Sequence, residues 1–171
     1  MSSSTPLKVE PLTAAGFAEF GVVLEAAGEP DFFINAGRCG RYHDLGRAKV
    51  VDDVGSVGLS VGESGFVTLP FEVDLMERHP LGSQAFVPMV AARLVVIVAP
   101  DLDGRPGPAR AFLSDGSQGI QYHANVWHGV LAPLDHPANV LIVDRVGPGN
   151  NLEEVRLETP YVVQAAPGSS E

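Results

Sequence analysis

Cysteine is nearly absent from this chain of 171 residues, which contains Cys39 and no other. A single cysteine excludes an internal disulfide framework, and it also excludes the cysteine and histidine spacing of a structural zinc site. Cys39 lies shortly before His43, so a thiol nucleophile with a histidine base is a minor alternative. The chemistry of this chain is therefore expected to rest on histidines, carboxylates and arginines.

Positive charge is also scarce, because 11 lysines and arginines face 21 aspartates and glutamates, for a net charge of −10. A nucleic-acid partner is excluded on this ground, since its phosphates require a basic surface. Only Lys8 and Lys49 are lysines, and the other basic side chains are arginines. The planar fork of arginine matches a carboxylate, which makes a small acidic substrate a reasonable expectation.

Long apolar segments are missing too. Residues 1–6 carry no basic stretch followed by an apolar one, so a secretory signal is not expected. The longest strongly apolar run is far shorter than a membrane span. These features predict a cytoplasmic protein without a membrane partner.

Glycine and proline are abundant, with 19 and 14 copies. This composition favours many short strands joined by turns over a few long helices. The 45% apolar content suits one globular domain. We expect a single domain over residues 1–171, with loose ends at 1–6 and 165–171.

The hydrophobic pattern is mainly that of β-structure. Thr13 is a candidate N-cap for a short helix that carries Phe17 and Phe20. Residues 71–75 alternate apolar and acidic side chains, whereas 94–99 and 140–143 are continuous apolar runs that predict strands covered on both faces. Residues 100–108 read as a turn cluster. The predicted strands are 8–12, 57–61, 66–69, 71–75, 94–99 and 140–143, which indicates a barrel or a sandwich.

Four of the five histidines fall in three short clusters with aromatic or charged neighbours. Histidine exchanges protons near neutral pH and is the commonest metal ligand, so repeated clustering favours function over isolated buried histidines. The clusters are Arg41-Tyr42-His43, Glu77-Arg78-His79 and Tyr122 through His128.

Strand geometry gives these clusters a first arrangement. Glu77 and His79 share one face of a strand, and a Pro-Leu-Gly-Ser turn can bring Gln84 back beside them. His123 and His128 would point to opposite faces of a straight strand, and we expect His123 to be the one inside the barrel. Trp127 is either a wall of the pocket or part of the core.

The frame E-x-H-x4-Q at Glu77, His79 and Gln84, followed by His123, resembles an altered cupin metal motif. Longer segments are more specific: D-F-F-I-N-A-G, R-Y-H-D-L, E-R-H-P-L-G-S-Q-A-F-V-P-M, Y-H-A-N-V-W-H and L-I-V-D-R occur here in the order found in the ureidoglycolate lyase family. The resemblance runs over residues 8–161. It implies a cupin-type β-barrel of the jelly-roll kind with a short N-terminal helix, a homodimer, and the cleavage of (S)-ureidoglycolate into glyoxylate and urea.

The clusters and the chemistry of this substrate suggest a set of site residues. The candidates for catalysis are His79, His123 and His43 as acid or base, with Glu77 orienting or tuning one of them. The candidates for substrate binding are Arg41, Tyr42, Arg78, Gln84, Tyr122, Trp127 and His128. A divalent metal such as nickel, zinc or manganese would be held by Glu77, His79, Gln84 and His123.

Several alternatives stay open from the sequence. The amide of Gln84 stands where a carboxylate is usual, so a pocket without metal is as reasonable as a metal site. Ala124 and Gly129 differ from the larger polar residues that flank these histidines in some relatives, which alters the polarity of the pocket. The chain could also be a hydrolase that releases ammonia, a non-catalytic cupin that binds a small ureide or sugar acid, or a metal-dependent dioxygenase or isomerase.

Overall fold

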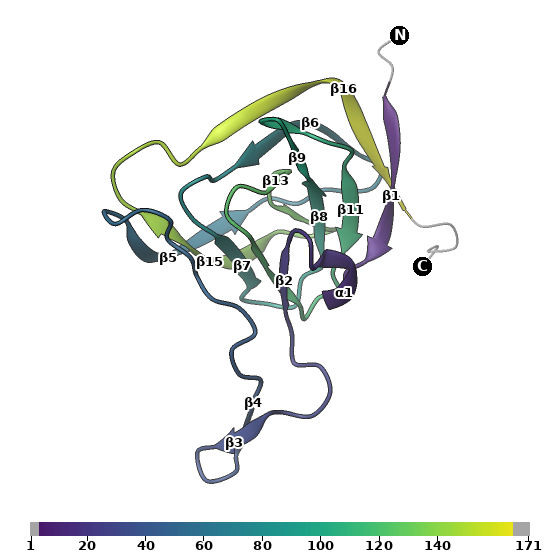
Figure 1. The fold of residues 1–171 in the computed structure, drawn as a ribbon. Helices are drawn as coiled ribbons and strands as arrows, with labels where there is room; N and C mark the ends of the chain where they lie inside the picture. Colours follow the sequence, from purple (N-terminus) through teal and green to yellow (C-terminus); the bar gives the residue numbers. More distant parts are fainter. Residues whose placement is uncertain (1–3, 166–171) are drawn as a thin grey trace.

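The computed structural model describes residues 4–165 and is almost entirely β, as Figure 1 shows. Its only α-helix among these residues is α1 (Ala14–Phe17). The longer strands are β1 (Thr5–Pro11), β2 (Gly21–Leu24), β5 (Ser56–Ser64), β6 (Phe71–Arg78), β7 (Gln84–Pro88), β8 (Leu94–Ala99), β11 (Arg110–Leu113), β12 (Gly119–Tyr122), β15 (Ala138–Val146) and β16 (Glu153–Gln164). The shorter strands are β3 (Phe32–Ile34), β4 (Cys39–Arg41), β9 (Asp101–Leu102), β10 (Arg105–Pro106), β13 (Trp127–His128) and β14 (Ala132–Pro133).

Six strands form a closed barrel in the order β11-β1-β16-β6-β13-β8, because β8 also pairs with β11. A second sheet, β2-β12-β7-β15-β5, packs against it. The mainly β, cupin-type barrel expected from the sequence is thus confirmed. No helix among the described residues is long and apolar enough to cross a membrane.

Strand β8 lies between two hydrophobic cores, and its sequence is therefore a continuous run of apolar residues. Val96 and Val98 pack in the core between the two sheets, whereas Val95 and Ile97 pack in the second core with Trp127. All six residues of β8 are buried. The prediction of a strand covered on both faces is confirmed here.

The N-terminal helix closes one end of the core between the sheets. Its N-cap Thr13 accepts a hydrogen bond from the Gly16 amide, 3.1 Å away, as the sequence predicts. Phe17 and Phe20 are buried, and the Phe17 ring meets Phe112 edge to face at 5.6 Å. The packing of these aromatic rings therefore closes this end of the core against solvent.

Some predicted boundaries were wrong. Strand β5 continues through Gly62 to Ser64, because it pairs with β15 along its whole length. Residues 66–69 form no strand and contribute only an isolated bridge from Val67 to Leu134. In β15 only Val140 of the run 140–143 is buried, because the other face of this sheet is turned outward. Residues 5 and 6 belong to β1, whereas residues 1–3 and 166–171 of the predicted loose ends lie outside the described residues.

A hairpin made of β3 and β4 projects away from the two sheets (Figure 1). We call residues 28–47 the arm. None of residues 24–50, all of them described, is buried. The arm has therefore no hydrophobic core within its own chain.

Candidate active site

One acidic residue and two histidines meet between the barrel and the second sheet. Glu77 is the penultimate residue of β6, and His79 is the first residue after this strand. His128 on β13 pairs directly with Glu77. The Glu77 Oε1 atom lies 3.9 Å from His79 Nε2 and 3.9 Å from His128 Nδ1. Among residues 4–165 these three form the one group whose histidine and acidic ligand atoms all lie within 4.8 Å of one another.

Backbone carbonyls fix the tautomer of both imidazoles. His79 Nδ1 lies 2.7 Å from the Asn151 carbonyl oxygen, and His128 Nδ1 lies 3.0 Å from that of Gly129. Because a carbonyl can only accept, each Nδ1 carries the proton, and each neutral ring leaves Nε2 with a free lone pair. Both Nε2 atoms are buried and have no hydrogen-bond partner. Two lone pairs are therefore available for a proton, a substrate or a metal.

Burial sets the charge of these groups. Burial raises the pKa of Glu77, the proximity of His79 opposes this shift, and the negative charge of Glu154 adds to it. Burial also lowers the pKa of His128 to about 4, despite its hydrogen bond to Gly129. His128 is thus a neutral imidazole at physiological pH, whereas Glu77 is a stronger base than an ordinary carboxylate.

Tyr122 and Gln84 extend the site from the second sheet. The Tyr122 ring stacks on His128 with centroids 4.3 Å apart and planes 5° from parallel. Gln84 pairs directly with Tyr122 across β7 and β12, so the two side chains share a face. Gln84 Nε2 donates to Asp144, while Gln84 Oε1 is buried without a partner. The turn after His79 thus returns Gln84 to the face of the second sheet on which Tyr122 stacks on His128. The place of Gln84 beside Glu77 and His79 stays a prediction.

The expected position of His123 was wrong. Its side chain is exposed, and His128 occupies the inner place that the sequence prediction gave to His123. The physical reason is the turn between β12 and β13, where Asn125 adopts a positive φ of 69° and donates its amide hydrogen to the His79 carbonyl. Asparagine favours such turns, and this was the one sequence signal for the bend.

Arg78 and Trp127 face away from the cluster. Their neighbours Glu77 and His128 point between the sheets, so alternation along the strands turns Arg78 and Trp127 to the opposite face. The Arg78 guanidinium lies 4.5 Å from the centre of the Trp127 ring and pairs with Asp101 and Glu153. Trp127 donates its indole N–H to Asp101 and belongs to the core. The geometry therefore gives neither residue a place at the cluster.

The structure also separates Arg41, Tyr42 and His43 from the cluster of their own chain, because all three lie on the arm. Tyr42 donates its hydroxyl hydrogen to the Gly28 carbonyl, and the exposed His43 packs against Phe32. Cys39, the minor alternative for a nucleophile, is exposed on the same hairpin.

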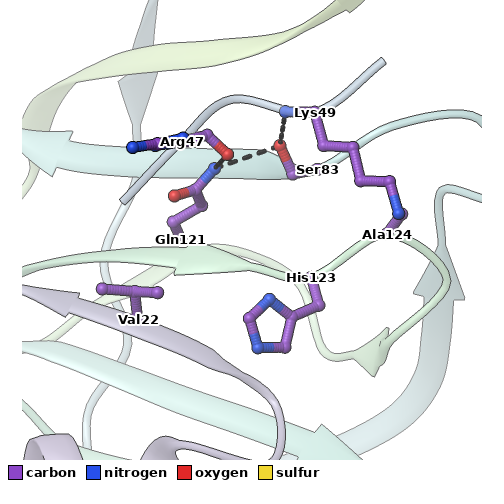
Figure 2. Close-up of a pocket in the computed structure, with 7 residues that line it drawn as sticks. All are labelled: Val22, Arg47, Lys49, Ser83, Gln121, His123 and Ala124. Atoms are coloured by element: carbon purple, nitrogen blue, oxygen red, sulfur yellow. Dashed lines mark hydrogen bonds between the residues drawn. The ribbon is translucent and has the colours of Figure 1, made fainter. Parts of the chain in front are cut away.

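A separate pocket of about 230 Å³ lies where the second sheet meets the segment that follows the arm (Figure 2). Ser83 Oγ accepts hydrogen bonds from the Lys49 amide and from Gln121, and Gln121 also donates to the Arg47 carbonyl. These polar groups satisfy one another, so we interpret the pocket as the anchor of the arm's base. His123 lines this pocket.

The cluster is chemically suited to a divalent metal. Two imidazoles and one carboxylate are the ligands of a catalytic zinc site that leaves a position open. Two buried lone pairs without partners support the fit, and backbone carbonyls orient both rings, as is usual for metal-bound histidines. The predicted ligand set is thus modified: the cluster contains Glu77 and His79, with His128 in the place given to His123, and Gln84 stays a predicted ligand.

Fold and site together define a protein of the cupin type with a histidine and carboxylate centre. The family model for ureidoglycolate lyase matches residues 4–164. A ureidoglycolate lyase of Rhodobacter capsulatus is 49% identical over 158 residues, which covers 92% of this chain and 98% of that protein. A ureidoglycolate lyase of Chelativorans is 46% identical over 154 residues, or 90% of this chain and 93% of that protein. This chain belongs to the ureidoglycolate lyase family.

Proposed function

We propose that this chain is a lyase that splits (S)-ureidoglycolate into glyoxylate and urea. Family membership over almost the whole chain supports the reaction, since the relatives are named for it. The structural observation that carries the proposal is the pair of unpartnered Nε2 lone pairs beside a half-buried carboxylate. A buried, unsatisfied polar cluster destabilises the fold unless it serves a ligand or a reaction.

The reaction requires one proton to move. The substrate carbon carries a carboxylate, a hydroxyl group and a ureido nitrogen. Glu77 takes the hydroxyl proton while the oxygen forms the carbonyl of glyoxylate, the C–N bond breaks, and the bonding pair leaves with the nitrogen. That nitrogen receives the proton and becomes urea, so no water is consumed. A raised pKa suits Glu77 to both transfers, because a catalytic group is most effective when its pKa approaches the working pH.

The two histidines position the substrate in this proposal. His128, neutral because of its lowered pKa, accepts a hydrogen bond through Nε2 rather than donating a proton. His79 Nε2 is close enough to Glu77 to share the same substrate hydroxyl. Glu77, His79 and His128 would also hold a divalent ion such as nickel, zinc or manganese. Such an ion, when bound, polarises the hydroxyl and carboxylate oxygens of the substrate.

The product analysis tests this function directly. Chelator-treated protein is incubated with racemic ureidoglycolate, and glyoxylate, urea and ammonia are measured together, with and without added divalent metals. Equal amounts of urea and glyoxylate are expected. Ammonia in place of urea would instead identify the hydrolase, and saturable binding without turnover would identify a binding protein.

The cytoplasmic location expected from the sequence stays a prediction.

Arg78 provides a test of the site's boundary. Replacing Arg78 by methionine should leave KM for ureidoglycolate within about threefold of the wild-type value, because the guanidinium faces away from the cluster. The free energy of unfolding should fall by about 1–3 kcal/mol, because the charged hydrogen bonds to Glu153 and Asp101 are lost. Urea denaturation and steady-state kinetics measure the two effects. A KM raised tenfold or more at normal kcat would return Arg78 to the role of carboxylate clamp.

A further inference from the structure

The arm exposes apolar side chains that its own chain does not cover. Phe33 is 63% exposed, Phe32 is 41% exposed and Leu45 is 40% exposed. Large apolar groups gathered on one projecting element mark a contact surface. The exposed apolar side chains of the arm therefore indicate a surface that contacts another molecule.

The arm is also held in a defined position. The Tyr42 hydroxyl lies 2.9 Å from the Gly28 carbonyl oxygen, and the His43 amide nitrogen lies 2.7 Å from an Asp31 carboxylate oxygen. At its base the segment is fixed to the second sheet by the hydrogen bonds drawn in Figure 2. A preset shape lowers the entropic cost of docking.

One face of the arm carries groups that suit an anionic substrate. Arg41 pairs with Phe32 across the hairpin, with its guanidinium carbon 5.7 Å from the centre of that ring, and the His43 ring lies 5.3 Å from it. Arg41 takes part in no ion pair with any residue in the described part of the chain. Its charge is thus free for another partner.

The cluster in turn has acidic groups and no cationic side chain. Within residues 4–165 the Glu77 carboxylate lies 3.9 Å from a ring nitrogen of His79 and of His128, and it forms no ion pair with a lysine or an arginine. Glu154 lies directly opposite Glu77 on β16. Asp144 accepts a hydrogen bond from Gln84 at the same site. The cluster is open to solvent on one side, with 23% of the Glu77 side chain and 16% of the His79 side chain exposed. A substrate carboxylate would meet no arginine from its own chain there.

We propose that the arm of one chain enters the site of a second copy and places Arg41 against the carboxylate of the substrate. The free arginine of the arm complements the acidic cluster, and the pair of copies is related by a two-fold axis, so that each arm serves the other chain. This inference rests on the proposed function for the identity of the substrate. It also makes the predicted homodimer part of the active site.

A second apolar surface supports a second copy as the partner. Val57, Leu59 and Val61 on β5 are 49%, 74% and 61% exposed. Strand β5 is the edge of the second sheet and pairs with β15, which carries Asp144. Asp144 lies opposite Gly58, so strand alternation turns Val57, Leu59 and Val61 to the other, outer face of this sheet. An exposed apolar edge strand of this kind is a surface on which the exposed phenylalanines of a partner's arm can pack. Both surfaces become covered in the same two-fold pair.

Hybrid dimers test the exchange of arms. Chains with Arg41→Ala and chains with His79→Ala are co-expressed under different tags, and the dimers that carry both tags are purified. Arg41→Ala alone should lower kcat/KM about 10- to 100-fold, as expected for a lost charged hydrogen-bond pair. In the hybrid one intact pocket meets one intact arm, so about half of the wild-type activity per dimer should return.

The matched control is a hybrid of His79→Ala with His128→Ala, in which both pockets are damaged and no activity should return. An Arg41→Ala enzyme with normal kinetics would overturn the proposal. So would an Arg41/His79 hybrid no more active than its parents, because an arm that serves its own chain predicts that result.

Cys39 allows a second test that needs no turnover. It lies two residues before Arg41 on β4, on the same face of the strand, and it is the only cysteine of the chain. A benzophenone maleimide attached to Cys39 should give, on irradiation, a covalent dimer linked to peptides that contain β5 or residues 77–84. Links confined to one chain, or to other surfaces, would overturn the docking. Links to these peptides in a protein without lyase activity would uphold the docking and reject only the proposed function.

Discussion

Replacing His128 by asparagine should lower kcat/KM for ureidoglycolate about 10²- to 10⁴-fold, whereas the same change at His123 should leave it within about threefold. His128 belongs to the cluster, has a buried Nε2 without a hydrogen-bond partner and is 1% exposed, while His123 is exposed beside the anchor of the arm. Steady-state kinetics on both variants measure the difference. The pair is well matched, because the two histidines are five positions apart in one segment.

Folding must be separated from catalysis in this comparison, because His128 is buried and stacked on Tyr122. Thermal unfolding of both variants, together with a His128→Gln variant that keeps an acceptor at a similar distance, provides the control. A folded His128→Asn enzyme with nearly normal turnover would remove His128 from the mechanism. A large loss for His123→Asn at unchanged stability would restore the role that the sequence alone suggested.

Replacing Glu77 by glutamine should reduce kcat about 10²- to 10⁴-fold, since the amide cannot take the hydroxyl proton. The same change should lower the amount of bound divalent ion if the cluster holds one, because the ligand loses its charge. Kinetics and metal analysis of the purified variant check the two effects. Full activity of Glu77→Gln would contradict the proposed proton transfer.

Glu154→Gln is the matched control and should behave differently. The negative charge of Glu154 helps to raise the pKa of Glu77, so its removal should lower that pKa. The acidic limb of the profile of kcat/KM against pH should then move to lower pH, while the rate at the optimum stays close to that of the wild type. A shift to higher pH would contradict the assignment of this limb to Glu77.

Much of the fold was predictable from local pattern. The apolar run at 94–99 predicted β8 because a strand between two cores needs apolar side chains on both faces. Thr13 predicted the start of the helix because its hydroxyl can satisfy a free amide there. Strand ends were harder: Gly62 looked like part of a turn, yet pairing with β15 carries β5 through it.

The sequence by itself determined the chemistry of this protein and its family resemblance: Glu77, His79 and Gln84 lie in one short frame, and His123 and His128 lie in one short segment. The tertiary structure decided which of the two histidines is the inner one. The turn after β12 leaves His123 outside, and the pairing of β13 with β6 sets His128 against Glu77. The tertiary structure also separated Arg41 and His43 from the cluster, because their hairpin extends from the body instead of folding over it (Figure 1). Contacts between distant segments settled both points, and local sequence does not encode them.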